Sequence, residues 1–143
     1  MRIKILLIGD DPGSAIADSL VLRERGLLVL TAFNYQNINE IVAEIKPDLV
    51  FFDPHSSDNR ITDAYNNFVN SILFTEIPVI FTLADDDVYL VTKKRTAMKD
   101  KRTGIADNMI DAVKMALSNT KQSYKKNYKQ SLFPQAIIPF NFQ

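Results

Sequence analysis

Four short apolar runs alternate with polar or amphipathic segments over the first part of the chain. The runs are rich in Ile, Leu, Val and Phe, and they lack the strict apolar–polar alternation of a strand with one face in water. Runs of this kind are typical of strands that are covered on both faces. We therefore predict strands at 3–8, 27–32, 49–52 and 77–81.

The segments between the runs have helical periodicity. In the first of them, which ends at Gly26, Ile16, Leu20 and Arg23 share one face, and Leu22 lies beside them. Further apolar stripes, the second of which includes Ile72, predict helices over 37–45, 61–73 and 107–118. Strands that alternate with helices predict an α/β fold with a doubly wound parallel sheet.

The region after the fourth strand has two interpretations. Residues 86–102 begin with acids, become basic and are followed by Gly104, which suits a helix and its macrodipole. Residues 88–92, Val-Tyr-Leu-Val-Thr, have instead the composition of a strand. We favour the helix.

The chain is long enough for one ordinary domain, which we place at 1–119. Residues 120–143 begin as a polar and basic linker and end in an apolar tail at 132–142. We expect this tail to dock on the domain, pair with a sheet edge or contact another subunit.

Composition excludes several classes of site. Seventeen Lys and Arg balance 17 Asp and Glu, so whole-chain charge indicates no polyanionic partner. There is no Cys, and the single histidine, His55, argues against a His-based zinc site. No apolar run is long enough to span a membrane, and no signal-peptide pattern is present, so we expect a cytoplasmic protein.

Acidic residues follow two of the predicted strands. Asp10 and Asp11 come after the first strand, and Asp53 comes after the third. If the two strands are neighbours, the carboxylates converge at the sheet edge where doubly wound proteins bind ligands. Clustered carboxylates suit Mg²⁺ and phosphoryl transfer onto Asp53. The alternative is that these acids only cap helices and start turns.

Three blocks of sequence resemble the receiver domains of two-component response regulators. They are 5–12 (Ile-Leu-Leu-Ile-Gly-Asp-Asp-Pro), 46–53 (Lys-Pro-Asp-Leu-Val-Phe-Phe-Asp) and 77–84 (Ile-Pro-Val-Ile-Phe-Thr-Leu-Ala). Their spacing matches an ordinary receiver, and the resemblance covers about residues 2–84, with 107–118 as the last helix. It implies the flavodoxin-like receiver fold, with an atypical region after the fourth strand.

The resemblance also implies roles for individual residues. Asp53 would be the phosphoacceptor, and Asp10, Asp53 and the backbone carbonyl of His55 would bind Mg²⁺. Asp11 would support the site. We expect the His55 imidazole itself to be a solvated surface group.

The sequence departs from the receiver pattern at several positions. Gly9 replaces the first acid of the usual pair. The phosphoryl-binding hydroxyl is expected at Leu83, whereas Thr82 lies one residue earlier and should face the other side of the sheet unless a bulge rotates it. The usual lysine has no clear counterpart; Lys93 comes too early, and Lys101 lacks a strand before it.

The predicted function is a stand-alone receiver in a phosphorelay, not an enzyme in the usual sense. Its partners would be a histidine kinase or phosphotransfer protein and a downstream protein, or a second copy of the chain. The alternative is a phosphorylation-independent pseudo-receiver that acts as a protein interaction module.

Other functions suit the residues less well. The Gly9-to-Gly13 turn lacks a dinucleotide fingerprint and its acids would repel a flavin phosphate, while Asp53-Pro54-His55 lacks the second Asp of a phosphatase motif. The Lys and Tyr residues of 121–129 could contact nucleic acid, but a solvated extension explains them better.

Overall fold

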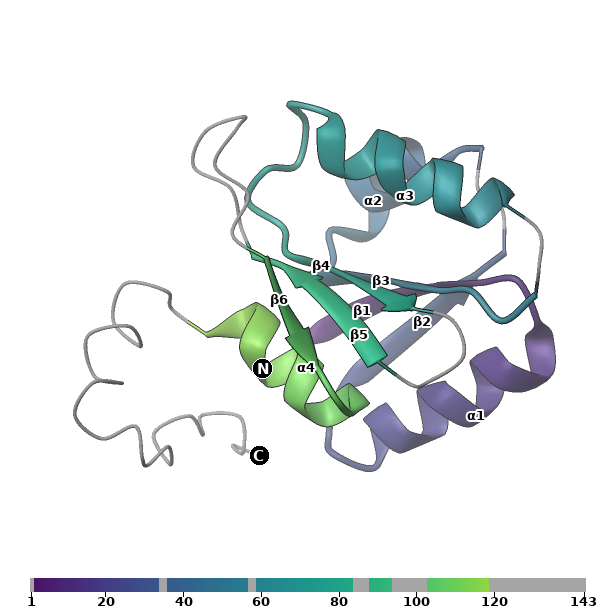
Figure 1. Ribbon diagram of the computed structural model, residues 1–143, viewed down its shortest axis with the longest axis vertical. Helices are drawn as coiled ribbons and strands as arrows, with labels where there is room; N and C mark the ends of the chain where they lie inside the picture. Colours follow the sequence, from purple (N-terminus) through teal and green to yellow (C-terminus); the bar gives the residue numbers. More distant parts are fainter. Residues whose placement is uncertain (1, 34–35, 57–58, 84–87, 94–102, 119–143) are drawn as a thin grey trace.

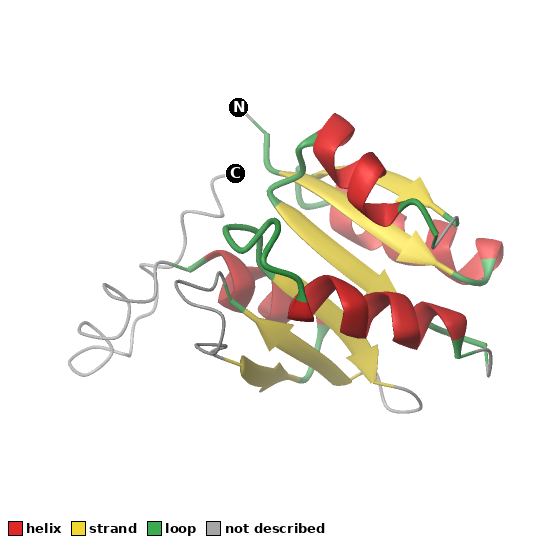
Figure 2. Ribbon diagram, turned by 90° about the horizontal axis from the view of Figure 1, so that it is seen from above, coloured by secondary structure: helices red, strands yellow, loops and turns green. Residues whose placement is uncertain are grey.

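The computed structural model describes residues 2–33, 36–56, 59–83, 88–93 and 103–118. Within them, helices α1 and α4 cover one face of a six-stranded sheet, and α2 and α3 cover the other (Figures 1 and 2). The elements in chain order are β1 (Lys4–Gly9), α1 (Pro12–Arg23), β2 (Leu28–Ala32), α2 (Ile38–Ile45), β3 (Leu49–Asp53), α3 (Arg60–Asn70), β4 (Val79–Leu83), β5 (Val88–Thr92), β6 (Thr103–Ala106) and α4 (Met109–Leu117).

The strand order is β2-β1-β3-β4-β5-β6. Neighbours from β2 to β4 pair in parallel, whereas β5 is antiparallel to both β4 and β6. The prediction of an α/β fold with a mostly parallel, doubly wound sheet is therefore confirmed. This architecture is compatible with a flavodoxin-like fold, but the antiparallel β5 and the additional β6 depart from the sheet of a receiver domain.

The favoured helix over 86–102 is wrong for the part that the structure describes, because residues 88–92 form strand β5. All five of its residues pair with β4. Without β5, β4 would be an unpaired edge of the parallel sheet. Tyr89 and Val91 are buried, and the Tyr89 ring meets the edge of Phe51 at a centroid distance of 5.9 Å. β preference and long-range pairing thus outweigh the charge gradient of this segment.

The core consists of two clusters, one on each face of the sheet. Alternate strand residues enter alternate clusters, so Leu49 and Phe51 pack with α1 and α4, while Val50 and Phe52 pack with α2 and α3. The central strands β1 and β3 are buried on both faces, which explains their nearly continuous apolar sequence.

Two helices differ from the sequence prediction in which residues they bury. Ile16 and Leu20 on α1 are 59% and 51% exposed. The inward side of α1 is offset by one residue, so that Ala15, Ser19 and Leu22 are buried. Helix α3 ends at Asn70, and Ile72 lies beyond it and is exposed. Gly26 has φ +86°, which confirms a glycine-dependent turn after α1.

Other predictions concern the surface and the chain end. No helix within the described residues is long and apolar enough to cross a bilayer.

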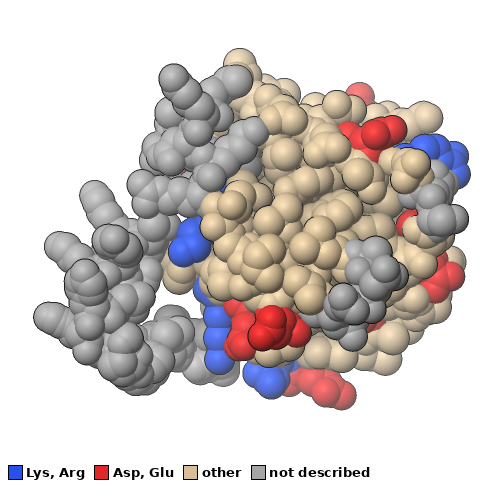
Figure 3. Space-filling model, viewed as in Figure 1, with Lys and Arg blue, Asp and Glu red and all other residues tan. Residues whose placement is uncertain are grey.

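On the face drawn in Figure 3, the described Lys and Arg side chains are few, and several lie beside Asp or Glu. The described domain ends at residue 118, so the predicted linker and tail at 120–143 lie outside the described residues.

Candidate functional site

Asp53 is the last residue of β3, at the carboxyl end of a central strand. The residues two and four before it, Phe51 and Leu49, pack on the face of α1 and α4. Because side chains alternate along a strand, Asp53 also points to that face. The residue is 1% exposed, although ordinary aspartates lie at the surface.

Thr82, on the neighbouring strand β4, donates a hydrogen bond from Oγ1 to Asp53 Oδ1 at 2.6 Å. The expectation that Thr82 faces away from Asp53 is therefore wrong. In the parallel register Phe52 is the partner of Phe81, so the next residues, Asp53 and Thr82, are also level with each other. Ile80 packs in the same cluster as Phe51, which places Thr82 on the side of Asp53 without any bulge.

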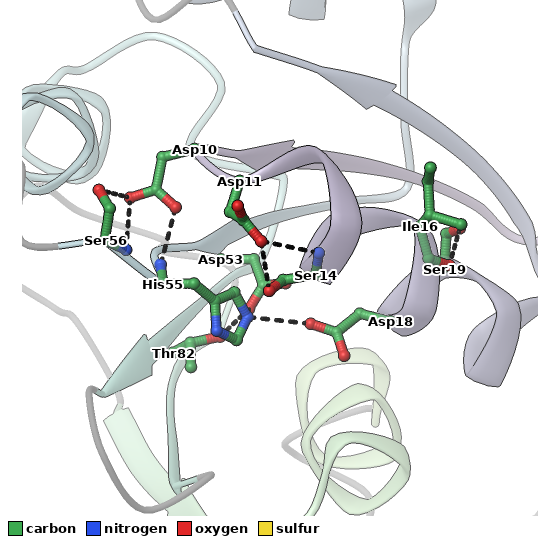
Figure 4. A network of polar contacts seen from close by, with 10 residues as sticks. All are labelled: Asp10, Asp11, Ser14, Ile16, Asp18, Ser19, Asp53, His55, Ser56 and Thr82. Atoms are coloured by element: carbon green, nitrogen blue, oxygen red, sulfur yellow. Dashed lines mark hydrogen bonds and ion pairs between the residues drawn. The ribbon is translucent and has the colours of Figure 1, made fainter.

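The His55 imidazole lies over the carboxylate (Figure 4). Its Nε2 is 3.1 Å from Asp53 Oδ1 and 3.1 Å from Oδ2 of Asp18, which is on α1. The side chains of His55 and Asp18 are 30% and 21% exposed. His55 is exposed, as expected of a surface group, but its imidazole also contacts two carboxylates.

The environment changes the proton affinity of this group. Burial is the main cause that raises the pKa of Asp53 to about 7, and the neighbouring Asp18 carboxyl adds to it, while Thr82 and His55 act in the opposite direction. Burial lowers the pKa of His55, but the negative charges of Asp53 and Asp18 outweigh it and the net pKa is raised. Asp53 and His55 thus titrate together, and their proton belongs to the pair.

Asp10 and Asp11 hold the backbone at the edge of the site. Asp10 Oδ1 accepts a hydrogen bond from the His55 backbone N–H at 2.7 Å, and its Oδ2 accepts from Ser56 N–H and Oγ at 3.2 and 2.9 Å. Asp11 is the N-cap of α1, where its Oδ2 accepts from Ser14 N–H and Oγ at 3.0 and 2.7 Å. Asp10 reaches Asp53 only through the backbone of the His55 loop (Figure 4).

The sequence suggested two lysines for the site. Lys93 follows β5, whose Thr92 pairs with Val79 at the start of β4, so Lys93 lies at the opposite end of the sheet from Asp53. Its Nζ is 3.4 Å from Ser118 Oγ. Lys101 lies outside the described residues. The structure therefore does not bring Lys93 to Asp53.

Asp18 is the functional residue that the sequence analysis missed. Its signal was helical spacing: it follows Ala15 by three residues and precedes Leu22 by four, and both of these are buried. It therefore lies on the inward side of α1. Choosing the stripe of Ile16 and Leu20 as the inner face concealed this position.

One atom in the site lacks a partner. Asp53 Oδ2 is buried and has no hydrogen-bond partner among the residues that the structure describes. Buried polar atoms nearly always have a partner, so an orphan marks a place where a ligand or reaction is expected. Asp53 thus has one oxygen held by Thr82 and one available.

Searches of protein families, curated proteins and solved structures found no match to the chain.

Proposed function

We propose that the chain is a receiver-like signalling module that accepts a phosphoryl group on Asp53 and acts on a partner protein. The observation that carries this proposal is the hydrogen bond of 2.6 Å between Thr82 Oγ1 and Asp53 Oδ1. It couples a hydroxyl and a carboxylate at the carboxyl ends of two adjacent parallel strands, which is where doubly wound proteins bind ligands.

The two oxygens of Asp53 suit different roles in that reaction. Thr82 holds Oδ1, which orients the carboxylate, and Oδ2 has no partner and can attack phosphorus. Attack requires the ionised carboxylate. Since the pKa of Asp53 is raised to about 7, about half of the molecules carry this form at neutral pH.

Mg²⁺, which the receiver resemblance implies, does not fit the side chains as they are arranged. Both Asp10 oxygens accept hydrogen bonds from the His55–Ser56 loop, and the groups beside Asp53 are the Asp18 carboxylate and an imidazole nitrogen. Mg²⁺ prefers oxygen ligands in octahedral geometry. Acceptance of a phosphoryl group would require His55 to move, and no step through Mg²⁺ follows from this arrangement.

The same observations favour a second function, a phosphorylation-independent interaction module. Asp53 is covered, Asp10 is engaged by the loop, and Lys93 lies at the opposite end of the sheet from Asp53. In this case the chain would share only its fold with receiver domains. The surface that binds the partner would then lie elsewhere, for example in the apolar tail at 132–142.

Beryllofluoride, which mimics an aspartyl phosphate, separates the two functions. We expect a bound ¹⁹F NMR signal with the whole chain at millimolar Mg²⁺, its loss in Asp53→Asn, and its retention in the matched control Asp63→Asn, which removes an exposed acid. Absence of a bound signal in the folded wild type would refute phosphoryl acceptance. Partner binding that survives Asp53→Asn but is lost on truncation after Asn119 would then support the interaction module.

A further inference from the structure

The side chains around Asp53 form a cluster of three possible metal ligands from three separate elements. Asp18 comes from α1, Asp53 from the end of β3, and His55 from the loop that follows. One ligand atom from each residue lies within 4.8 Å of the others, and His55 Nε2 is 3.1 Å from an oxygen of each acid. Atoms that each lie about 2.0–2.2 Å from one Zn²⁺ are separated from one another by distances similar to these. Only small movements of the three side chains would therefore be needed to coordinate an ion.

The cluster also contains an unsatisfied atom. Asp53 is 1% exposed, and its Oδ2, in the same carboxylate as the Oδ1 that faces Nε2, has no hydrogen-bond partner. Two carboxylates so close together, one of them buried, repel each other unless a proton or a cation lies between them. A cation would neutralise both acids and give the orphan oxygen a partner.

The chemistry of the ligands selects the ion. An imidazole nitrogen with two carboxylate oxygens suits the divalent transition metals, whereas Mg²⁺ and Ca²⁺ prefer oxygen ligands alone. The partly exposed His55 and Asp18 leave one side open to solvent, while Asp53 closes the other. We propose that Asp18, Asp53 and His55 bind one divalent transition-metal ion, with Zn²⁺ the expected occupant, and leave a further coordination position open.

The sequence contains no other imidazole and no thiolate to compete for such an ion. The chain has no Cys and no second His, and residues 119–143 contain no Asp or Glu. The single histidine argued against a zinc site made of several histidines, but two carboxylates supply the remaining ligands here. Asp10 would take no part as a ligand and would instead hold the loop that carries His55.

This site goes beyond the proposed phosphoryl acceptance and has a different consequence for Asp53. A bound metal would occupy Asp53 and hold His55 and Asp18 over it, so metal and phosphoryl group would compete. Metal binding would also tie α1 to the end of β3 and raise the stability of the domain by mass action.

Co²⁺ provides a direct test, because at a protein site with a low coordination number it has intense d–d absorption bands in the visible spectrum. We expect the metal-free whole chain to bind one Co²⁺ with a visible spectrum, Zn²⁺ to abolish that spectrum at one equivalent, and millimolar Mg²⁺ to leave it unchanged. Asp18→Asn and His55→Gln should each weaken binding at least tenfold, while Asp63→Asn should bind as the wild type does. Circular dichroism of each variant establishes that it is folded.

Three results would overturn the proposal: no Co²⁺ spectrum in the folded wild type, wild-type affinity in Asp18→Asn, or displacement of Co²⁺ by Mg²⁺ at equal concentration. Asp18 also separates this proposal from the preceding one, because it is a ligand in this proposal and neither attacks nor holds the phosphoryl group in the other. A beryllofluoride signal without metal binding would refute the metal site alone, and metal binding without a beryllofluoride signal would refute phosphoryl acceptance alone.

Discussion

Replacing Asp53 by Asn should remove most of the pH dependence of stability between pH 5 and pH 8. The side chain keeps its shape, and its Oδ1 can still accept the hydrogen bond from Thr82. What it loses is a carboxyl group whose pKa is raised from 3.8 to about 7 in the folded protein. Between these values the folded state binds a proton that the unfolded chain has released, so stability falls as pH rises.

The size of the effect follows from the two pKa values. The interval from 3.8 to about 7, at about 1.4 kcal/mol per unit, gives an upper limit of about 4 kcal/mol for the free energy of unfolding lost at high pH. Part of this loss is already present at pH 5, and the larger part develops between pH 5 and pH 8. The variant should therefore be more stable than the wild type at pH 8, and by a smaller margin at pH 5.

The coupled histidine contributes with the same sign. The net pKa of His55 is raised, so its stabilising contribution is present below about 6.5 and is lost as pH rises through its folded-state pKa. His55→Gln should thus reduce the slope in part, whereas Asp63→Asn should leave it unchanged.

Urea unfolding at pH 5, 6, 7 and 8, in buffers with a chelator that keeps metals out, measures these slopes. A wild-type stability that rises over this interval, or a slope in Asp53→Asn equal to that of the wild type, would refute the assignment of a shared proton to Asp53.

Three further substitutions test the fold by urea unfolding. Asp11→Ala should cost about 1 kcal/mol because it removes the N-cap of α1, and an unchanged midpoint would contradict the cap. Gly26→Ala should cost about 1 kcal/mol because φ is +86°, whereas Gly13→Ala, in the first turn of a helix with no atom nearer than 3.8 Å to the new Cβ, should be neutral or stabilising. Phe52→Ala should cost about 3–5 kcal/mol, since the ring is fully buried, and a loss below about 1 kcal/mol would disprove that packing.

The parts of the fold that sequence predicted best are those with strong local patterns. The central strands β1 and β3 are apolar because they are buried on both faces, and this property is visible without knowing the partners. Segment 88–92 was harder, since its local charge pattern and its β-branched composition disagree. Pairing with β4 settled the matter, and that pairing is invisible in a local window.

The candidate site was predicted in its centre and missed in its surroundings. Asp53 at a strand end could be recognised from sequence, and the structure places it in a buried position beside Thr82 and His55. The orientation of Thr82 depends on the register of β4, and the position of Asp18 depends on which side of α1 packs inward. Each is changed by a shift of one residue, which sequence patterns resolve poorly.

The contacts around Asp53 connect any ligand bound to its carboxylate with His55 and Ser56, the residues that follow β3. Thr82 holds one oxygen of Asp53, His55 lies over that carboxylate, and Asp10 fixes the backbone of His55 and Ser56. Under the two proposals, a phosphoryl group on Asp53 would displace the imidazole from the carboxylate, whereas a metal would hold it where it is. The two ligands would then favour different positions of His55, and a ligand shifts such an equilibrium only by the difference in its affinity for the two positions. His55 and Ser56 are exposed, so either proposal would let the state of Asp53 be read at the surface.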